Sequence, residues 1–116
     1  MGMFDTIAAT LECPVNRESK ERQILIKWRE QRQLEVFRQG NSIDGIMPGY
    51  DDAWVRTDYI CESCSHMTPG KHGNFVKVED QIRHYCYIRV EKGVVVHVLS
   101  GDEFSKLGIE DYVLDE

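Results

Sequence analysis

The sequence predicts a small, mainly β fold with an antiparallel sheet and one short helix near the C-terminus. Short runs of β-branched and aromatic residues alternate with turns rich in Gly, Pro and Asn, which is typical of β domains. A helix-capping pattern occurs only close to the end of the chain. At 116 residues, with 41% hydrophobic and 29% charged residues, the composition suits one modest core. We therefore expect residues 1–116 to form a single domain.

The first predicted strand covers residues 6–12 and ends at a corner. Cys13 and Pro14 follow this run, and Asn16 tolerates the left-handed conformation that a tight turn needs. The corner would hold Cys13 in place. Alone, this cysteine reads as a small buried hydrophobic residue that ends a strand.

Residues 19–39 admit two interpretations. Apolar residues at 24–28 and at 34–37 indicate two strands separated by a polar stretch. The alternative is one long helix, because Glu, Arg, Gln and Leu all have high helix propensity. Steps of three and four from Trp28 land on Gln31 and Arg32, which breaks a helical apolar stripe. Two strands are therefore the preferred prediction.

A strand over residues 53–60 is expected to lead into Cys61, after a loop over residues 40–52. Residues 67–74 are predicted to be irregular. A hairpin then joins 82–90 to 94–99 across a three-residue loop that ends in Gly93. This register would place Cys86, Ile88 and Val90 on one apolar face with Val94, Val96 and Val98.

The C-terminal segment begins with a capping box. Ser100 and Glu103 can satisfy each other's free backbone donors, and Gly108 is a natural helix stop. About two helical turns fit between them. Residues 109–116 could form an edge strand, a docked tail or a frayed end.

The residues that carry chemistry are the cysteines. Cys61 and Cys64 have the spacing of one pair of zinc ligands, and Cys13 is the expected third ligand. We predict His66 as the fourth, because it lies closest in sequence, with His72, His84 and Cys86 as other candidates. Zinc is the expected metal and its role would be structural. Asn16 stands where a second thiol would complete the first pair, so a knuckle that has lost its metal is the alternative.

Net charge excludes some functions. The chain carries −6 at pH 7, which argues against binding nucleic acid, since such affinity comes mostly from Lys and Arg. One face could still stack single-stranded bases, because it alternates arginines with tyrosines; it carries Arg83, Tyr85, Tyr87 and Arg89. We find no signal peptide and no run of about 20 apolar residues that could cross a membrane, so we expect a cytoplasmic protein without membrane contact.

Several short motifs together resemble a known group of proteins. They are the opening Met1-Gly2-Met3-Phe4-Asp5, the Cys-Pro turn, residues 34–40, Cys61-x-x-Cys64 and the C-terminal hairpin. The chain is in these respects similar to small uncharacterised phage and prophage proteins of zinc-ribbon type. The resemblance implies a zinc-ribbon-like β domain, an accessory role and a structural metal. The chain departs from the pattern at Asn16.

Three functions remain open from the sequence. The leading hypothesis is a non-enzymatic module that binds another protein, because no catalytic constellation is recognisable. The second is an acidic inhibitor that imitates nucleic acid and blocks a host protein. The third is a small thiol oxidoreductase that uses Cys61 and Cys64. Its sequence support is weaker, because Glu62 between the thiols opposes a low thiolate pKa. The sequence makes no prediction about oligomeric state.

Overall fold

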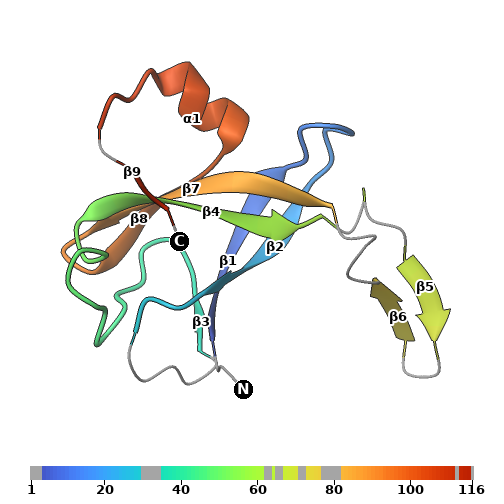
Figure 1. The fold of residues 1–116 in the computed structure, drawn as a ribbon, viewed down its shortest axis with the longest axis horizontal. Coiled ribbons are helices and arrows are strands. Elements are labelled where there is room, and N and C mark those ends of the chain that lie inside the picture. The colour runs from blue at the N-terminus through green and yellow to red at the C-terminus, as the bar shows by residue number, and fades with distance from the viewer. Residues whose placement is uncertain are drawn as a thin grey trace.

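Two packed β-sheets form the framework of the computed structural model (Figure 1). The structure describes residues 4–29, 35–61, 64, 67–70, 73–76, 82–111 and 113–115, with side chains for all of these except 67–70 and 73–76. The prediction of a mainly β fold with a short C-terminal helix is confirmed.

The first sheet has three strands in the order β2-β1-β3. Strands β1 (Asp5–Glu12) and β2 (Ser19–Ile26) pair antiparallel over their full length, and β3 (Val36–Phe37) adds in parallel. Alternate residues of β2 are buried and exposed, as expected for a strand with one face on a core. This pairing rules out a helix at the start of the 19–39 segment. Residues 30–34, between the two predicted strands, lie outside the described residues.

The second sheet has the order β8-β7-β4-β9. It combines β4 (Ala53–Ile60), β7 (Arg83–Glu91), β8 (Val94–Ser100) and the short β9 (Val113–Asp115), which pairs in parallel with β4. Of the three possibilities for the tail, the edge strand is therefore the one adopted. A separate hairpin of β5 (Met67–Gly70) and β6 (Gly73–Val76) forms where the sequence predicted an irregular loop.

The hydrophobic core lies between the inner faces of the two sheets. Ile7, Leu11 and Ile24 from the first sheet are fully buried, as are Val55 and Ile88 from the second. Figure 1 shows β1 and β2 crossing β4 and β7, so that the sheets meet in the middle of the molecule. The apolar side chains that alternate along each strand thus account for how the sheets pack.

Helix α1 (Gly101–Leu107) covers the outer face of the second sheet. Ser100 Oγ accepts from the Glu103 backbone N–H at 3.2 Å, and the Glu103 carboxylate accepts from the Ser100 N–H, so the predicted capping box is confirmed. Gly108 ends the helix with a left-handed φ of 62°. Phe104 stacks on Tyr87 with ring centroids 3.8 Å apart. The helix therefore covers part of the face that could have stacked nucleic-acid bases.

The β7–β8 hairpin differs from its predicted geometry. Its loop has two residues, Lys92 and Gly93, with φ of 51° and 77°, and positive φ at both positions is the mark of a type I′ turn. The register then shifts between Arg89 and Val90, where the pairing becomes irregular. The two-residue loop pairs Val90 with Val95, so Val95 is fully buried with Ile88 and Val90, while Val94 and Val96 are only half-buried.

The β1–β2 corner also departs from expectation in one detail. Arg17 takes the left-handed conformation, with φ of 63°, in place of the predicted Asn16. The Asn16 side chain accepts instead from the Glu18 backbone N–H at 2.9 Å. This hydrogen bond stabilises the tight turn, which is the role for which a left-handed Asn16 was expected.

One buried ion pair braces the end of β1 away from this corner. Asp5 and Arg29 form two hydrogen bonds of 2.8 and 2.9 Å, and Asp5 also accepts from the Glu35 backbone N–H. Arg29 further donates to the Asp44 carbonyl and lies over the Phe37 ring. The pair thus ties β1 to the segments before and after residues 30–34.

We expect the variant Arg29→Met to lose about 3–5 kcal/mol of unfolding free energy, because it leaves the Asp5 carboxylate buried without its partner. The control Arg38→Met removes the exposed pair with Glu21 and should cost less than about 1 kcal/mol. Urea unfolding measures both. Equal effects would show that burial adds nothing to the Asp5–Arg29 pair.

Candidate metal centre

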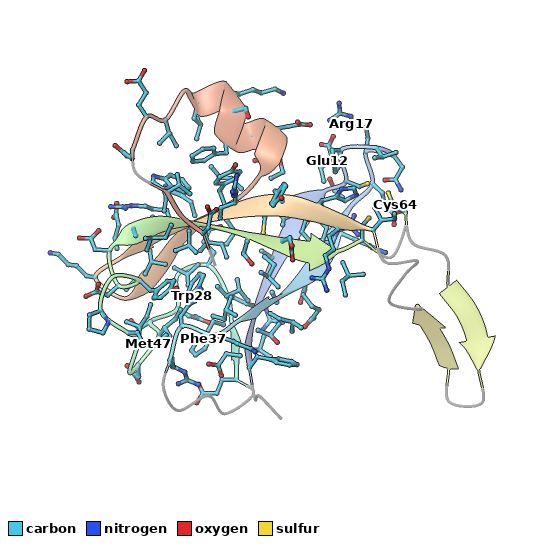
Figure 2. All side chains as sticks on the ribbon, in the orientation of Figure 1. Glu12, Arg17, Trp28, Phe37, Met47 and Cys64 are labelled. Atoms are coloured by element: carbon cyan, nitrogen blue, oxygen red, sulfur yellow. The ribbon has the colours of Figure 1, made fainter. Side chains whose placement is uncertain are left out.

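Three cysteines and one histidine meet at the end of the core where β1 turns into β2. Cys13, Cys61, Cys64 and His84 place their Sγ and ring-nitrogen atoms within 4.8 Å of one another. Figure 2 shows Cys64 at this end of the molecule, near Glu12 and Arg17, while Trp28 and Phe37 lie toward the opposite side. Four soft or borderline ligands in this arrangement are the set that a tetrahedral metal site uses.

Backbone hydrogen bonds hold two of the cysteines in position. Cys13 lies at the corner after β1, where its N–H donates to the Glu18 carbonyl and its carbonyl accepts from the Arg17 N–H, both at 2.9 Å. Cys61 directly follows β4, and its N–H donates to the Ile82 carbonyl at 2.8 Å. Both thiols are therefore held by the ends of regular strands.

The antiparallel register of β4 with β7 brings His84 to the same place. Tyr59 pairs with His84 and Ile60 with Arg83, so the histidine lies two positions back from Cys61 on the neighbouring strand. Because side chains alternate along a strand, Tyr59, Cys61 and His84 all point to the inner face.

Three separations around Cys13 match the edges of a tetrahedron around zinc. With Zn–S of about 2.3 Å and Zn–N of about 2.0 Å, two sulfurs should lie about 3.8 Å apart, and a sulfur and a nitrogen about 3.5 Å apart. Cys13 Sγ lies 3.5 Å from Cys64 Sγ, 3.7 Å from Cys61 Sγ and 3.6 Å from His84 Nε2. Cys13 is thus the shared corner of three edges of the right length.

The surroundings of the thiols favour one thiolate. Burial would raise the pKa of Cys13, but hydrogen bonds from the backbone of Asn16 and Val15, with contacts from Cys64 and Cys61, lower it from 9.0 to about 7. The contact with Cys13, together with burial, raises the pKa of Cys64 to about 12. These surroundings therefore favour loss of the proton from Cys13 over its loss from Cys64.

Arg22 brings a buried positive charge to the cluster. Its guanidinium donates to Cys61 Sγ at 3.7 Å, to the Leu11 carbonyl at 3.3 Å and to the Glu18 carbonyl at 3.0 Å. Burial first, and then the charge of Arg22, lower the pKa of His84. A neutral imidazole is the form that coordinates a metal.

Among the described residues, the fourth member of the cluster is His84. Cys13, Cys61 and Cys64 all belong to the cluster, whereas the predicted fourth ligand His66 lies outside the described residues, as does His72. Cys86 is fully buried in the core and is not part of the cluster. His84 was one of several candidates, and the available signal was that its strand would pair with the one ending at Cys61.

The outer face of the second sheet gives little support to a nucleic-acid interface. Arg56, Arg83 and Arg89 each form an ion pair with an aspartate, at 2.6 to 3.0 Å. Phe104 covers Tyr87, which leaves Tyr85 as the exposed ring of this face. The positive charge that a phosphate backbone would need is thus already paired.

Comparison with protein-family models, with curated proteins and with solved structures found no match. No helix within the described part of the chain has both the length and the apolar character needed to cross a membrane.

Proposed function

We propose that this protein is a non-enzymatic binding module whose fold is braced by one structural zinc ion. Cys13, Cys61, Cys64 and His84 are the ligands in this proposal. The single observation that supports it best is the set of three separations around Cys13 Sγ, each close to a tetrahedral edge. In this proposal His84 takes the place that the sequence suggested for His66.

Ligand chemistry favours zinc over other metals. Three thiolates and an imidazole suit zinc, whereas magnesium and calcium prefer oxygen ligands. Four protein ligands fill a tetrahedral site and leave no open position for a substrate. A closed site of this kind supports a structural role over a catalytic one.

The buried charge of Arg22 is compatible with a cluster that holds zinc. A zinc ion with three thiolates and a neutral imidazole carries a net charge of about −1. Arg22, which is 3% exposed and contacts Cys61, supplies the compensating charge. Burying either charge alone would be costly, so each favours the presence of the other.

A role in binding another protein is supported by the surface near the metal centre. Val15 at the β1–β2 corner is 73% exposed and Tyr85 on β7 is 62% exposed. Pro14, the neighbour of Val15, and Tyr85 line the same pocket, so these exposed apolar groups lie close together, as those of a contact surface do. As its resemblance implies, the proposal takes the chain to be an accessory protein of phage or prophage origin.

Protein purified without chelator should contain about one zinc ion per chain, and a strong chelator should lower its melting temperature. Cys61→Ser and His84→Asn should weaken zinc binding by about 100-fold or more, because each removes a direct ligand. Elemental analysis and competition with a chromophoric chelator measure these effects.

Matched controls come from the β7–β8 hairpin. Cys86→Ala removes a buried thiol outside the cluster, and His97→Asn removes an exposed histidine of the same hairpin. Both should retain zinc. Zinc content near zero in the wild-type protein, with a melting temperature unchanged by chelator, would contradict the proposed zinc site and favour the alternative of a knuckle that has lost its metal.

Zinc affinity should rise with pH, because the thiols have to lose their protons before they coordinate. The rise should become shallower above about pH 7, where Cys13 is already ionised. His84→Asn should lower the affinity at every pH above 6.5 without changing the slope, since the pKa of His84 is lowered and the ring is already neutral. A slope altered by this variant would contradict that assignment.

Arg22→Met should reduce zinc affinity by about 10- to 100-fold, which is the usual effect of losing an outer partner of a metal ligand. Lys20→Met is the control, because Lys20 lies on the same strand and is only half-buried. Competition titrations at low and high salt compare the two. Equal affinities would show that the Arg22 charge does not stabilise the loaded site.

A further inference from the structure

One sulfur of the metal centre is open to solvent, while the other two are buried. Cys13 and Cys61 are fully buried, whereas Cys64 is half-buried and lies near the β1–β2 corner (Figure 2). Zinc would hold each of these sulfurs as a thiolate, because a coordinating thiol loses its proton. An exposed thiolate is the form of cysteine that peroxides oxidise most readily. Cys64 is therefore the first sulfur that a small oxidant can reach.

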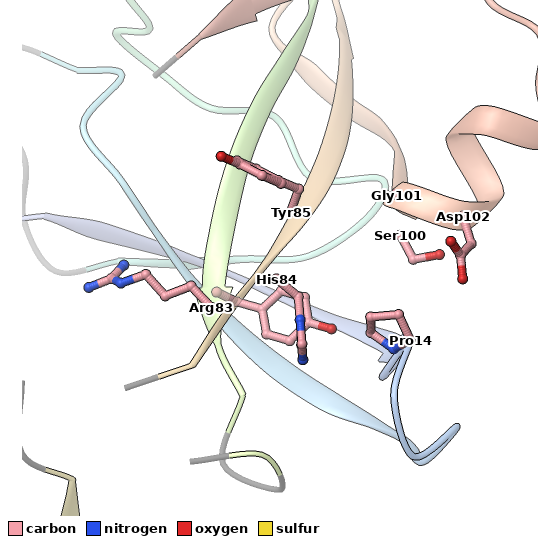
Figure 3. Close-up of a pocket in the computed structure, with 8 residues that line it drawn as sticks. Pro14, Arg83, His84, Tyr85, Ser100, Gly101 and Asp102 are labelled. Atoms are coloured by element: carbon pink, nitrogen blue, oxygen red, sulfur yellow. The ribbon is translucent and has the colours of Figure 1, made fainter. Parts of the chain in front are cut away.

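The pocket beside the cluster offers no second route to the sulfurs. It has a volume of about 240 Å³ and lies between the β1–β2 corner and the start of α1 (Figure 3). The residues described in its lining include Pro14 and His84 but none of the cysteines. On this side, access to the buried thiols is therefore closed, and the exposed side of Cys64 remains.

Cys13 is the sulfur best placed to react with an oxidised Cys64. The two Sγ atoms lie 3.5 Å apart, which is shorter than the 3.7 Å between Cys13 and Cys61. A disulfide bond is about 2.0 Å long, so the sulfurs of Cys13 and Cys64 need to approach by only about 1.5 Å. None of the four cysteines is in a disulfide in the structure, so this pair is available for oxidation.

Cys61 is a less suitable partner for Cys64. Its sulfur accepts a hydrogen bond from the Arg22 guanidinium at 3.7 Å, and both residues are buried. The positive charge of Arg22 stabilises a thiolate at Cys61, and a stabilised thiolate makes the corresponding disulfide easier to reduce. The sequence pointed to Cys61 and Cys64 for thiol chemistry, whereas the contacts favour Cys13 and Cys64.

We propose that hydrogen peroxide converts Cys13 and Cys64 into a disulfide and that the site then releases its zinc. The Cys64 thiolate attacks one peroxide oxygen, which breaks the O–O bond, forms a sulfenic acid and releases hydroxide. The Cys13 thiolate then attacks the Cys64 sulfur and displaces a second hydroxide. Two electrons thus pass from the two sulfurs to the peroxide. The inference rests on the proposed zinc site and adds a means of regulating it.

The disulfide would leave too few ligands for the metal. Cys61 and His84 remain, and two protein ligands do not complete a tetrahedral structural site. Arg22 then lies beside a single thiolate, and its positive charge opposes retention of a cation. The new bond joins the corner after β1 to the chain that follows β4. One crosslink between the two sheets therefore replaces another.

The test exposes the zinc-loaded wild-type protein to increasing amounts of hydrogen peroxide. A chromophoric chelator measures the released zinc, and peptide mapping by mass spectrometry after alkylation identifies the oxidised cysteines. We expect about one zinc ion released for each peroxide consumed, and a peptide crosslinked through Cys13 and Cys64. A thiol reductant with added zinc should restore the starting state. A crosslink between Cys61 and Cys64, or zinc retained with all thiols intact, would overturn the inference.

Two serine variants identify the thiol that reacts first, and they are compared without zinc because each lacks one ligand. In Cys61→Ser, peroxide should still form the disulfide between Cys13 and Cys64. In Cys64→Ser, the remaining thiols are all fully buried, and we expect their oxidation to be at least about tenfold slower. Circular dichroism first checks that both variants keep the β fold. Equal oxidation rates in the two folded variants would contradict the role of Cys64.

The zinc-loaded variant Cys86→Ala is the matched control. It removes a buried thiol that lies outside the cluster, so peroxide should release its zinc as it does from the wild-type protein. Zinc retained by this variant would show that Cys86 takes part in the oxidation, and would overturn the assignment to Cys13 and Cys64.

Zinc content distinguishes the failure of this inference from the failure of the metal site. A wild-type protein that binds zinc and keeps it in peroxide would contradict the disulfide and leave the zinc site standing. A wild-type protein that never binds zinc but forms the Cys13–Cys64 crosslink would contradict the zinc site and leave the thiol pair standing. The oxidised protein should melt above the reduced, zinc-free protein, because the disulfide crosslinks the chain. An equal or lower melting temperature would contradict the replacement of one crosslink by the other.

Discussion

The meeting of Cys13 with Cys61, Cys64 and His84 is the constraint on which this end of the structure depends. Cys13 ends the first strand of one sheet, while Cys61 and His84 belong to adjacent strands of the other. A chain of this size can bury only a modest core, and small domains often add metal ligands or similar crosslinks to compensate. Contacts among these four side chains join the two sheets at the edge of the core and help to hold their relative position.

At the opposite end of β1, the buried pair of Asp5 and Arg29 ties the strand to the segments that flank residues 30–34. The strand is thus anchored at both ends, by a carboxylate and guanidinium at one and by sulfur at the other. Between them, apolar side chains such as Ile7 and Leu11 pack against the second sheet. Hydrophobic burial is not directional, so the thiol cluster and the ion pair are what hold the two ends of β1 at defined positions.

The cluster and the neighbouring pocket share one residue. His84 faces the thiols through Nε2 and also lines the neighbouring pocket. Tyr59 shares that pocket, and its pKa is raised to about 12, mainly by burial, which keeps the phenol protonated.

Local features of the sequence determined much of the fold. The capping box at Ser100, the corner at Cys13, and the strand that leads into Cys61 each depend on residues only a few positions apart, so propensity and spacing were sufficient to predict them. Tertiary structure decided the rest. His84 joins the cluster only because β7 pairs with β4 in one register, Val95 becomes buried because a two-residue turn pairs it with Val90, and Arg22 reaches Cys61 only because the sheets pack together. Such contacts join residues far apart in the chain, and their free energy depends on the packing of the whole core, which no short window of sequence contains.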